Sequence, residues 1–369
     1  MKFTCSQQSL SKALNTVSKA VTSRTTIPIL KGILLRASSD GKLILSASDL
    51  DISIEKTLTE VNVEKEGEIV VLSKLFTDII RKLPEEDILI EQKEDQSILI
   101  KTNSSEFNIL GISSEEFPVI GEIEAEEKII FKNEFLKDMI RKTVFSASID
   151  DSKGIITGVL VELEEKSANM IALDGFRMAV VREEMQNNKK IKIIIAGKIL
   201  GEINKIISDF EGEEDIEFVL SKKKAVLTFE NTKIVIRLLD GDFIKYRDIL
   251  PNEKKCEIKV NKIMLHESME RAAILSREGK NNLIKFIIND NLLTITSRSE
   301  EGNVREDIDI TKEGVDMEIG FNSKYIIEAL KAIDDEEIML HMISSVKPCV
   351  IKPVSGNNYE YLILPVRIS

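Results

Sequence analysis

The sequence predicts an α+β protein in which one unit of about 120 residues, with two helices and antiparallel strands, is repeated three times. A strand leading into an amphipathic helix occurs three times at nearly constant spacing, and so does a second helix that begins with lysine. Stretches of alternating apolar and polar residues lie between the two helices, and this alternation is typical of half-buried strands. A long-period repeat of this kind indicates repeated domains rather than a short solenoid motif.

The first helix of each unit follows a short apolar strand. The three copies read "KFTCSQQSLSKALNTVSKAV", "IIFKNEFLKDMIRKTVFSAS" and "EIKVNKIMLHESMERAAILS". Aligning Ser6, Asn133 and Asn261 gives steps of 127 and 128 residues. Serine and asparagine are favoured at the position before a helix, so these three residues are the predicted N-caps.

The second helix of each unit carries a lysine at its start, namely Lys74, Lys198 and Lys324, with steps of 124 and 126 residues. An acidic turn and an apolar strand follow in every copy. Short acidic joints at 121–128 and 251–257 separate the copies. The predicted domains are therefore 1–121, 128–250 and 256–369, held in a fixed arc rather than tethered loosely.

The stretch "IALDGFRMAV", Ile171–Val180, raises the question of whether its Asp-Gly turn is structural or functional. Asp-Gly between apolar runs is a strong hairpin signal. Asp49 in "SASDLDI" precedes Asp174 by 125 residues, so the turn belongs to the repeated unit. Its basic role is structural, and only the details of the middle copy are candidates for a function.

Composition limits the class of protein. The 369 residues are 43% hydrophobic, which is enough for several cores, and the net charge is −12. Cys5, Cys256 and Cys349 are odd in number and far apart, so they indicate neither a disulfide framework nor a zinc site. No apolar run has the length of a signal peptide or membrane span, and we expect a cytoplasmic protein without cofactor or metal.

The charges are distributed unevenly along the chain. Six predicted helical windows carry 17 Lys and Arg against 8 Asp and Glu, so everything else is strongly acidic. Helix propensity does not explain the excess, because glutamate forms helices as well as lysine does. A helical surface that is positive can meet the phosphates of a duplex without reading bases. The windows are 8–24, 72–83, 133–148, 196–207, 261–280 and 322–333.

Taken together, the motifs resemble the bacterial β sliding clamps, the processivity subunits of DNA polymerase III, over the whole chain. The resemblance is specific because of the order and spacing of seven motifs. These are "MKFT", "TIPIL", "SASDLDI", "DGFRMAV", "AAILSRE", "MEIGFNSKY" and "LILPVRIS". The resemblance implies a homodimer whose six domains close a ring around double-stranded DNA, with helices lining the hole. It also implies a non-catalytic role, in which the ring tethers the polymerase III α subunit, the clamp loader, other polymerases and repair proteins, away from any membrane.

Three sets of residues are implied by the resemblance. The seam between two chains joins Phe107 and Ile109 to Ile274 and Leu275, although the last two are equally consistent with helix core. The candidate DNA-facing residues are Arg24, Lys74, Lys153, Lys198, Arg277 and Lys280. The candidate peptide groove consists of Ile156, Leu173, Gly175, Arg177, Met178, Ile249, Asn322, Tyr325, Ile343, Ser345, Leu362, Ile363, Leu364, Pro365, Val366 and Arg367.

Without the resemblance, the aliphatic groove residues would be read as ordinary core. With it, the turn at Asp174 places Arg177 and Met178 on the rim of the groove. The chain departs from the family's usual residues at Phe176, Ile244 and Asp248. These departures leave the ring intact and affect the peptide preference.

Two other classes of protein compete with this interpretation. An enzyme has little to work with, because His266 and His341 are the only histidines and no nucleotide, nucleophile-elbow or zinc-protease motif occurs. Asp49, Asp51 and Asp174 could hold a metal, but their recurrence favours turns. A monomeric adaptor that only displays peptide grooves would not need positive helices.

Overall fold

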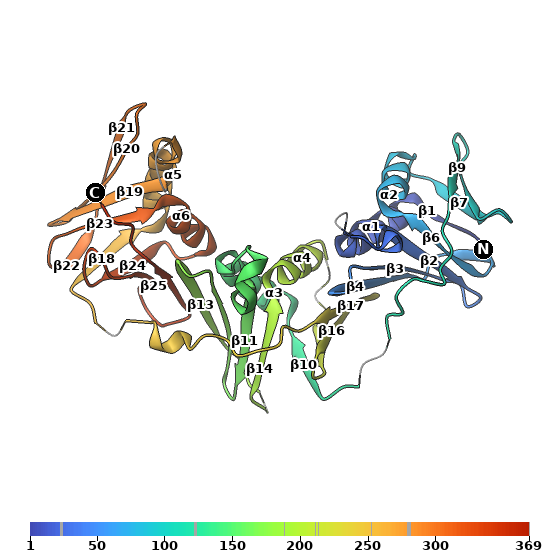
Figure 1. Ribbon diagram of the computed structural model, residues 1–369, viewed down its shortest axis with the longest axis horizontal. Helices are drawn as coiled ribbons and strands as arrows, with labels where there is room; N and C mark the ends of the chain where they lie inside the picture. Colours follow the sequence, from blue (N-terminus) through green and yellow to red (C-terminus); the bar gives the residue numbers. More distant parts are fainter. Residues whose placement is uncertain are drawn as a thin grey trace. The chain divides into compact units, whose positions relative to one another are not determined.

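The structure is a computed structural model that describes residues 1–22, 25–121, 124–187, 189–210, 212, 214–251, 253–278 and 282–368 (Figure 1). The chain forms two compact units. Met1–Phe135 and Lys205–Leu238 form the first unit, and Leu136–Asn204 and Leu239–Ser369 form the second. The middle of the chain thus contributes to both units.

In its described residues, the first unit holds a five-stranded sheet, ordered β5-β1-β7-β8-β9, and an eight-stranded sheet, ordered β10-β15-β16-β17-β4-β3-β2-β6. Strands paired in sequence, such as β3 and β4, are joined by short turns. The bounds are β1 Lys2–Ser6, β2 Gly32–Ser38, β3 Lys42–Ser48, β4 Ile52–Leu58, β5 Asn62–Lys65, β6 Gly67–Leu72, β7 Asp87–Gln92, β8 Ser97–Lys101, β9 Glu106–Leu110, β10 Glu127–Phe131, β15 Ile216–Leu220, β16 Lys224–Phe229 and β17 Thr232–Arg237.

The described part of the second unit holds a nine-stranded sheet, ordered β14-β11-β12-β13-β26-β25-β24-β18-β22, and a four-stranded sheet, ordered β21-β20-β19-β23. Every pairing in both is antiparallel. The bounds are β11 Gly158–Glu164, β12 Ser167–Leu173, β13 Arg177–Glu184, β14 Ile191–Ala196, β18 Cys256–Asn261, β19 Leu283–Asn289, β20 Leu292–Arg298, β21 Asn303–Asp309, β22 Thr311–Gly314, β23 Met317–Asn322, β24 Glu337–Met342, β25 Cys349–Pro353 and β26 Tyr359–Ile363.

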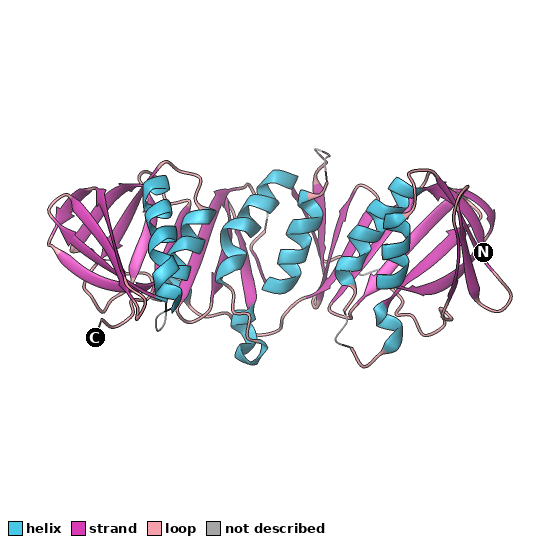
Figure 2. Cartoon of the chain, turned by 90° about the horizontal axis from the view of Figure 1, so that it is seen from above, coloured by secondary structure: helices cyan, strands magenta, loops and turns pink. Residues whose placement is uncertain are grey.

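The helices lie against the sheets and pack in pairs: α1 beside α2 in the first unit, and α5 beside α6 in the second (Figure 2). The apolar faces of these helices are buried; examples are Leu10 and Leu14 of α1 and Ile326 and Leu330 of α6. None of the described helices is long and apolar enough to cross a membrane. The bounds are α1 Gln7–Val17, α2 Ser73–Lys82, α3 Asn133–Thr143, α4 Gly197–Ser208, α5 Lys262–Glu278 and α6 Ser323–Ala332.

The predicted threefold repeat is confirmed by the register of three hairpins. The first pair of residues on either side of the turn is Ser48 opposite Ser53 in β3–β4, and Leu173 opposite Met178 in β12–β13. In β20–β21 it is Arg298 opposite Asn303. The three hairpins are therefore spaced by 125 residues, and the Asp174 turn is structural, as its recurrence predicted.

The helix starts confirm most of the expected pattern. Lys74, Lys198 and Lys324 are each the second residue of their helix. The Ser6 side chain accepts a hydrogen bond from the Ser9 N–H, and the Asn261 side chain accepts one from the Met264 N–H, so both are N-caps.

The prediction for the middle copy was wrong by one position, because α3 begins at Asn133 itself. The Asn133 side chain is buried and its amide donates to the Gly212 carbonyl. Gln7 does the same at the start of α1, where its amide donates to the Ile80 carbonyl. A buried amide at the first helical position, rather than a cap, is what these two copies share.

Strand pairing joins one repeat to the next at two places. In the first unit β4 pairs with β17, with Ile54 opposite Ile234. In the second unit β13 pairs with β26, with Ala179 opposite Tyr361. At this second joint the hydrogen bonds from Lys352 and Arg182 outweigh burial and lower the pKa of Glu360, so the carboxylate stays charged and paired.

Two glycines of the second unit provide a matched test of backbone packing. Gly314 and Gly175 have φ values of +96° and +95°, so a side chain costs about 1 kcal/mol at either. A Cβ at Gly314 would also lie 2.0 Å from the Lys255 carbonyl oxygen, whereas nothing lies within 4 Å at Gly175. We expect Gly314→Ala to destabilise the unit by at least about 2 kcal/mol more than Gly175→Ala, measured by hydrogen exchange of the β18 amides. Equal effects would contradict this packing.

Candidate apolar groove and cationic helix ends

Four of the predicted groove residues lie in one apolar cluster of the second unit. Ile156, Leu173, Met178 and Leu362 share this cluster, and the last three are nearly fully buried. The register explains the grouping, because Leu173 lies opposite Met178 and Met178 lies opposite Leu362. We call this cluster the groove cluster; its further members are Leu160, Ile171, Val180, Ile194, Phe243, Tyr246 and Val350, with Ile155, Leu239 and Leu250 packed against it.

Alternation along the strands separates the groove cluster from the opposite face of the same sheet. Met178 and Leu362 face the cluster, so their neighbours Arg177 and Ile363, which are paired with each other, point to the other side. The Arg177 guanidinium indeed contacts α6 and the Phe145 carbonyl. Ile363 is buried on that side and does not line the cluster.

The segment between β17 and β18 covers the groove cluster with two aromatic residues. Phe243 and Tyr246 are both buried. The Tyr246 hydroxyl donates to the Glu162 carboxylate at 2.9 Å, and Arg247 pairs with the same carboxylate at 3.0 Å. Burial and this hydrogen bond raise the pKa of Tyr246, so the hydroxyl remains a donor at neutral pH.

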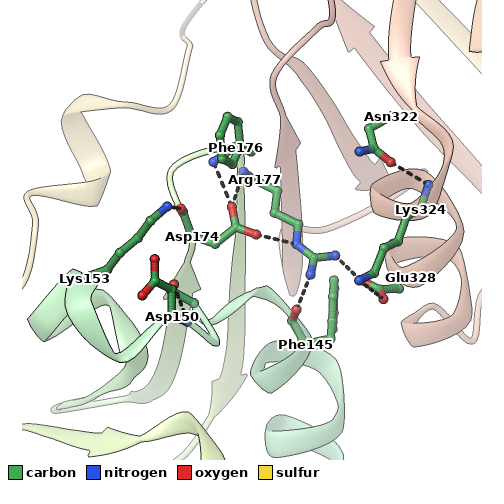
Figure 3. A network of polar contacts seen from close by, with 10 residues as sticks. Phe145, Asp150, Lys153, Asp174, Phe176, Arg177, Asn322, Lys324 and Glu328 are labelled. Carbon is green, nitrogen blue, oxygen red and sulfur yellow. Dashed lines mark hydrogen bonds and ion pairs between the residues drawn. The ribbon is translucent and has the colours of Figure 1, made fainter. Parts of the chain in front are cut away.

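The turn at Asp174 is held by a network centred on Arg177 (Figure 3). The Asp174 carboxylate accepts hydrogen bonds from the backbone N–H groups of Phe176 and Arg177, at 2.8 and 3.0 Å, and pairs with the guanidinium at 3.1 Å. Arg177 also pairs with Glu328 of α6, and its side chain is only 8% exposed. A guanidinium so fully satisfied fixes the turn to α6 and has little left to offer a ligand.

Aromatic rings extend the same network toward solvent. The Arg177 guanidinium lies 4.7 Å from the Tyr325 ring centre and 5.4 Å from that of Phe145. Phe176 stacks on Tyr325 with ring centres 6.3 Å apart, and the Lys153 ammonium lies 5.4 Å above the Phe176 ring. Phe176 remains 53% exposed, so its ring presents an apolar face to solvent at the Asp174 turn.

The C-terminal tail is anchored to this turn. The Leu364 N–H donates to the Phe176 carbonyl at 2.9 Å, and the Val366 N–H donates to the Gly320 carbonyl at 2.8 Å. Leu364 itself is 37% exposed. The tail therefore continues from β26 along the edge of the groove cluster.

The remaining predicted groove residues have other local roles or surface positions. The Asn322 side chain caps α6 through the Lys324 N–H. Gly175 allows the left-handed turn, and Ile249 is 41% exposed beside Leu250. The others are half-buried or exposed around β24 and in the tail, namely Ile343, Ser345, Pro365, Val366 and Arg367.

Of the predicted DNA-facing residues, Lys74, Lys198 and Arg277 are exposed on helices, whereas Arg24 and Lys280 lie outside the described residues. Lys74 and Lys198 form no ion pair in the described structure, and Arg277 approaches Glu270 at 3.8 Å. Lys153 differs, because its ammonium donates to the Asp174 carbonyl at 3.3 Å. Within the described helices, basic residues still outnumber acidic ones.

The predicted seam residues are accessible. Phe107 is 40% exposed on β9, which is the last strand of its sheet, and Ile109 is half-buried on the same strand. Ile274 is 65% exposed on α5 and Leu275 is half-buried. The exposure of Ile274 excludes the alternative that it is helix core.

Sequence reasoning missed Phe243, Tyr246, Val350 and Glu162 as parts of the groove cluster and its cover. Phe243 carried a signal, because the first repeat has Phe117 before Pro118 at the matching place. The pairing of Tyr246 with Glu162 spans 84 residues and had no sequence signal.

Comparison with known protein families matches nearly the whole chain. The N-terminal, central and C-terminal domain models of the DNA polymerase III beta subunit match residues 1–121, 130–245 and 247–367. The chain belongs to the DNA polymerase III beta subunit family. Its architecture is accordingly that of three clamp domains, each with two helices and antiparallel sheets.

Individual relatives agree in sequence and in structure. The beta sliding clamp of Staphylococcus aureus (strain Mu50) is 34% identical over 379 residues, covering 100% of this chain and 99% of that protein. The DNA polymerase sliding clamp of Bacillus subtilis has a TM-score of 0.94 at 33% identity. A putative beta subunit from Eubacterium rectale has a TM-score of 0.93 at 38% identity. Both structural matches cover 100% of each chain.

The Arg177 network leads to a prediction whose control, Lys324 of α6, pairs with the same glutamate, Glu328. We expect Arg177→Ala to destabilise the second unit by about 2 kcal/mol, because charge-assisted hydrogen bonds to Glu328, Asp174 and the Phe145 carbonyl are lost together. Arg177→Lys should recover only part of this, since an ammonium cannot replace the planar fork. Lys324→Ala, which removes an exposed pair of 3.9 Å with Glu328, should change stability by less than about 0.5 kcal/mol.

These variants are compared by chemical denaturation and by hydrogen exchange at the Phe176 and Arg177 amides, which depend on Asp174. Faster exchange in Arg177→Ala alone is the expected result. Equal effects of Arg177→Ala and Lys324→Ala would show that the network does not hold the turn.

Proposed function

We propose that the chain is a DNA sliding clamp: two copies close head to tail into a ring of six domains that encircles double-stranded DNA. The ring tethers the α subunit of polymerase III, and other polymerases, repair proteins and the clamp loader, through the groove cluster and its rim. The role is non-catalytic, since relatives of full length are named sliding clamps. Such a protein acts in the cytoplasm, where free buried cysteines such as Cys349 stay reduced.

The strand pairing between repeats is the observation that carries the proposal. Ser53 of β4 faces Val235 of β17, and Met178 of β13 faces Leu362 of β26. In the remaining repeat of each kind, the counterpart of β4 and β13 is β21, and the counterpart of β17 and β26 is β9. Both lie at the ends of their sheets in the described structure, so each presents an unpaired edge.

The repeat also fixes the register of the third joint. Asn303 occupies in β21 the place of Ser53 and Met178, as the three hairpins show. Asn108 occupies in β9 the place that Val235 occupies in β17 and Leu362 occupies in β26. Asn108 lies opposite Leu99 of β8, and Val235 and Leu362 lie opposite the equivalent residues of β16 and β25.

Pairing β9 of one chain with β21 of another in this register gives complementary side chains. Phe107 then faces Val304, and Glu106 faces Arg305. An apolar pair next to a pair of opposite charges is favourable across antiparallel strands. Two such seams between two chains leave no edge unpaired at the joints, which supports a closed dimer.

The lysines at the helix starts support the binding of a polyanion. A cation near a helix N-terminus is unfavourable by roughly 0.3–1 kcal/mol, because the helix dipole is positive there. The chain nevertheless places Lys74, Lys198 and Lys324 at the second position of three helices. A ligand that carries dense negative charge would offset this cost, and DNA phosphates have that density.

Cysteine pairs provide a test of the seam. We expect Asn108→Cys with Asn303→Cys to form an intermolecular disulfide on oxidation, because directly paired strands hold their Cα atoms within disulfide reach. The product is read as a covalent dimer on a non-reducing gel. The native cysteines Cys5, Cys256 and Cys349 are buried and should not react.

The matched control is Asn108→Cys with Asp309→Cys, which shifts one partner by six residues along β21. This pair should not cross-link, since six residues of strand extend about 20 Å. Equal cross-linking of both pairs, or of neither, would contradict the predicted register.

Retention on DNA tests the ring itself. After loading by a clamp loader, the protein should stay on a circular plasmid through gel filtration and be lost when a restriction enzyme cuts the circle. Reversal of charge at Lys74 and Lys198 together should reduce loading, whereas Lys42→Glu on the β2–β3 hairpin should not. Equal retention on cut and closed DNA would reject topological tethering.

A further inference from the structure

The first unit contains a cavity at the place that the groove cluster occupies in the second unit. Its volume is about 220 Å³, and its apolar side is formed by Leu34, Phe117, Val119 and Ile120. Leu34 and Phe117 belong to a small apolar cluster with Ile29, Leu30 and Val70. By hairpin register, Leu34 is the counterpart of Leu160, because they lie opposite Ser46 and Ile171 respectively. We call this cavity the first-repeat pocket.

The pocket is open because three positions differ from those of the second unit. Ser46 and Glu55 replace the apolar Ile171 and Val180 of the groove cluster. Ile120 stands three residues after Phe117, where Tyr246 stands three residues after Phe243. Tyr246 is buried and bonded to Glu162, whereas Ile120 is shorter and cannot make such a bond.

The polar side of the pocket is acidic. Glu55, Glu68 and Glu115 line it against a single Arg36. The Glu68 carboxylate already accepts from Arg36 at 2.8 Å and from the Ser114 hydroxyl at 2.6 Å. These two groups therefore neutralise each other and leave the other two carboxylates to set the charge of the pocket.

Glu55 and Glu115 retain capacity for a cation. Glu55 accepts from the Ser46 hydroxyl at 3.3 Å, and the nearest cation is the Lys233 ammonium at 3.9 Å, the limit of an ion pair. The Glu115 carboxylate has no ion pair within the described structure, and it lies beside Val119, which is 92% exposed. No group of three or more His, Cys, Asp or Glu side chains in the described residues could hold a metal ion. An organic cation is complementary in charge to the two carboxylates.

We propose that the first-repeat pocket binds a short peptide segment of a partner protein in which a lysine or arginine is flanked by apolar residues. The cationic group is placed between Glu55 and Glu115, and the apolar neighbours cover Phe117 and Val119. The volume suits one or two side chains rather than a cofactor. The site is separate from the groove cluster and does not depend on closure of a ring.

The test uses the full chain with isotope-labelled isoleucine methyl groups and the peptide acetyl-Leu-Arg-Leu-amide. We expect saturable shifts at Ile112 and Ile120 and none at Ile156 or Ile249 of the groove region. Acetyl-Leu-Gln-Leu-amide, which lacks the charge, should bind about fivefold more weakly or not at all. Shifts confined to Ile156 and Ile249, or no shifts, would overturn the proposal.

Variants locate the site. Glu55→Gln and Glu115→Gln should each weaken binding by about fivefold, whereas Glu116→Gln, an exposed neighbour that does not line the pocket, should not. Ile120→Tyr should fill the pocket as Tyr246 fills its counterpart and abolish the shift at Ile112. Unchanged affinity in Glu55→Gln and Glu115→Gln would overturn the proposal, as would concentration-dependent shifts at Ile120 without peptide, which would make a second copy the occupant.

Discussion

Pairing between the last strand of one repeat and the fourth strand of another is the constraint on which the rest of this structure depends. It joins β17 to β4 and β26 to β13, so that the sheets continue from one repeat into the next. Backbone hydrogen bonds in such a joint are insensitive to side-chain identity, which lets the repeats diverge while the joint persists. Three copies in one chain can form only two such joints. In the described structure β9 and β21 therefore lie at the ends of their sheets and keep an unpaired edge. The closed ring that we propose would pair these two edges between chains and so give every copy its joint.

The β13–β26 joint also explains why the groove cluster lies where it does. Pairing places Met178 and Leu362 on one face and Arg177 with Ile363 on the other. The first face collects apolar side chains from distant segments, and the second face receives the guanidinium that holds the turn to α6. The turn beside the groove cluster is thus fixed by an ion-pair network on the reverse side of the sheet. Phe176, stacked on Tyr325, then forms an aromatic edge that offers apolar rather than hydrogen-bonding contacts.

The sequence predicted the repeat, the helices and the hairpin turns because each depends on local periodicity and on residues such as Lys74 and Asp174 that recur at fixed spacing. It located Leu173, Met178 and Leu362 through the resemblance rather than through any pattern. It missed Tyr246 and Glu162, since a bond across 84 residues leaves no local signal. The position of Asn133 was off by one because asparagine serves equally well as a cap and as a buried amide donor, and only the Gly212 carbonyl decides between them.

The two units show how one scaffold carries different side chains on equivalent faces. In the second unit the face around Leu160 is apolar and covered by Phe243 and Tyr246. In the first unit the same face carries Glu55, and its cross-strand ion pair is Arg36 with Glu68, where the second unit has Glu162 with Lys192 in the opposite polarity. In both polarities opposite charges face each other across the two strands, which favours the pairing. The pair is neutral in either polarity, so the charge that faces the pocket comes from Glu55 and Glu115, and ligand preference can diverge between repeats while the strand pairing is kept.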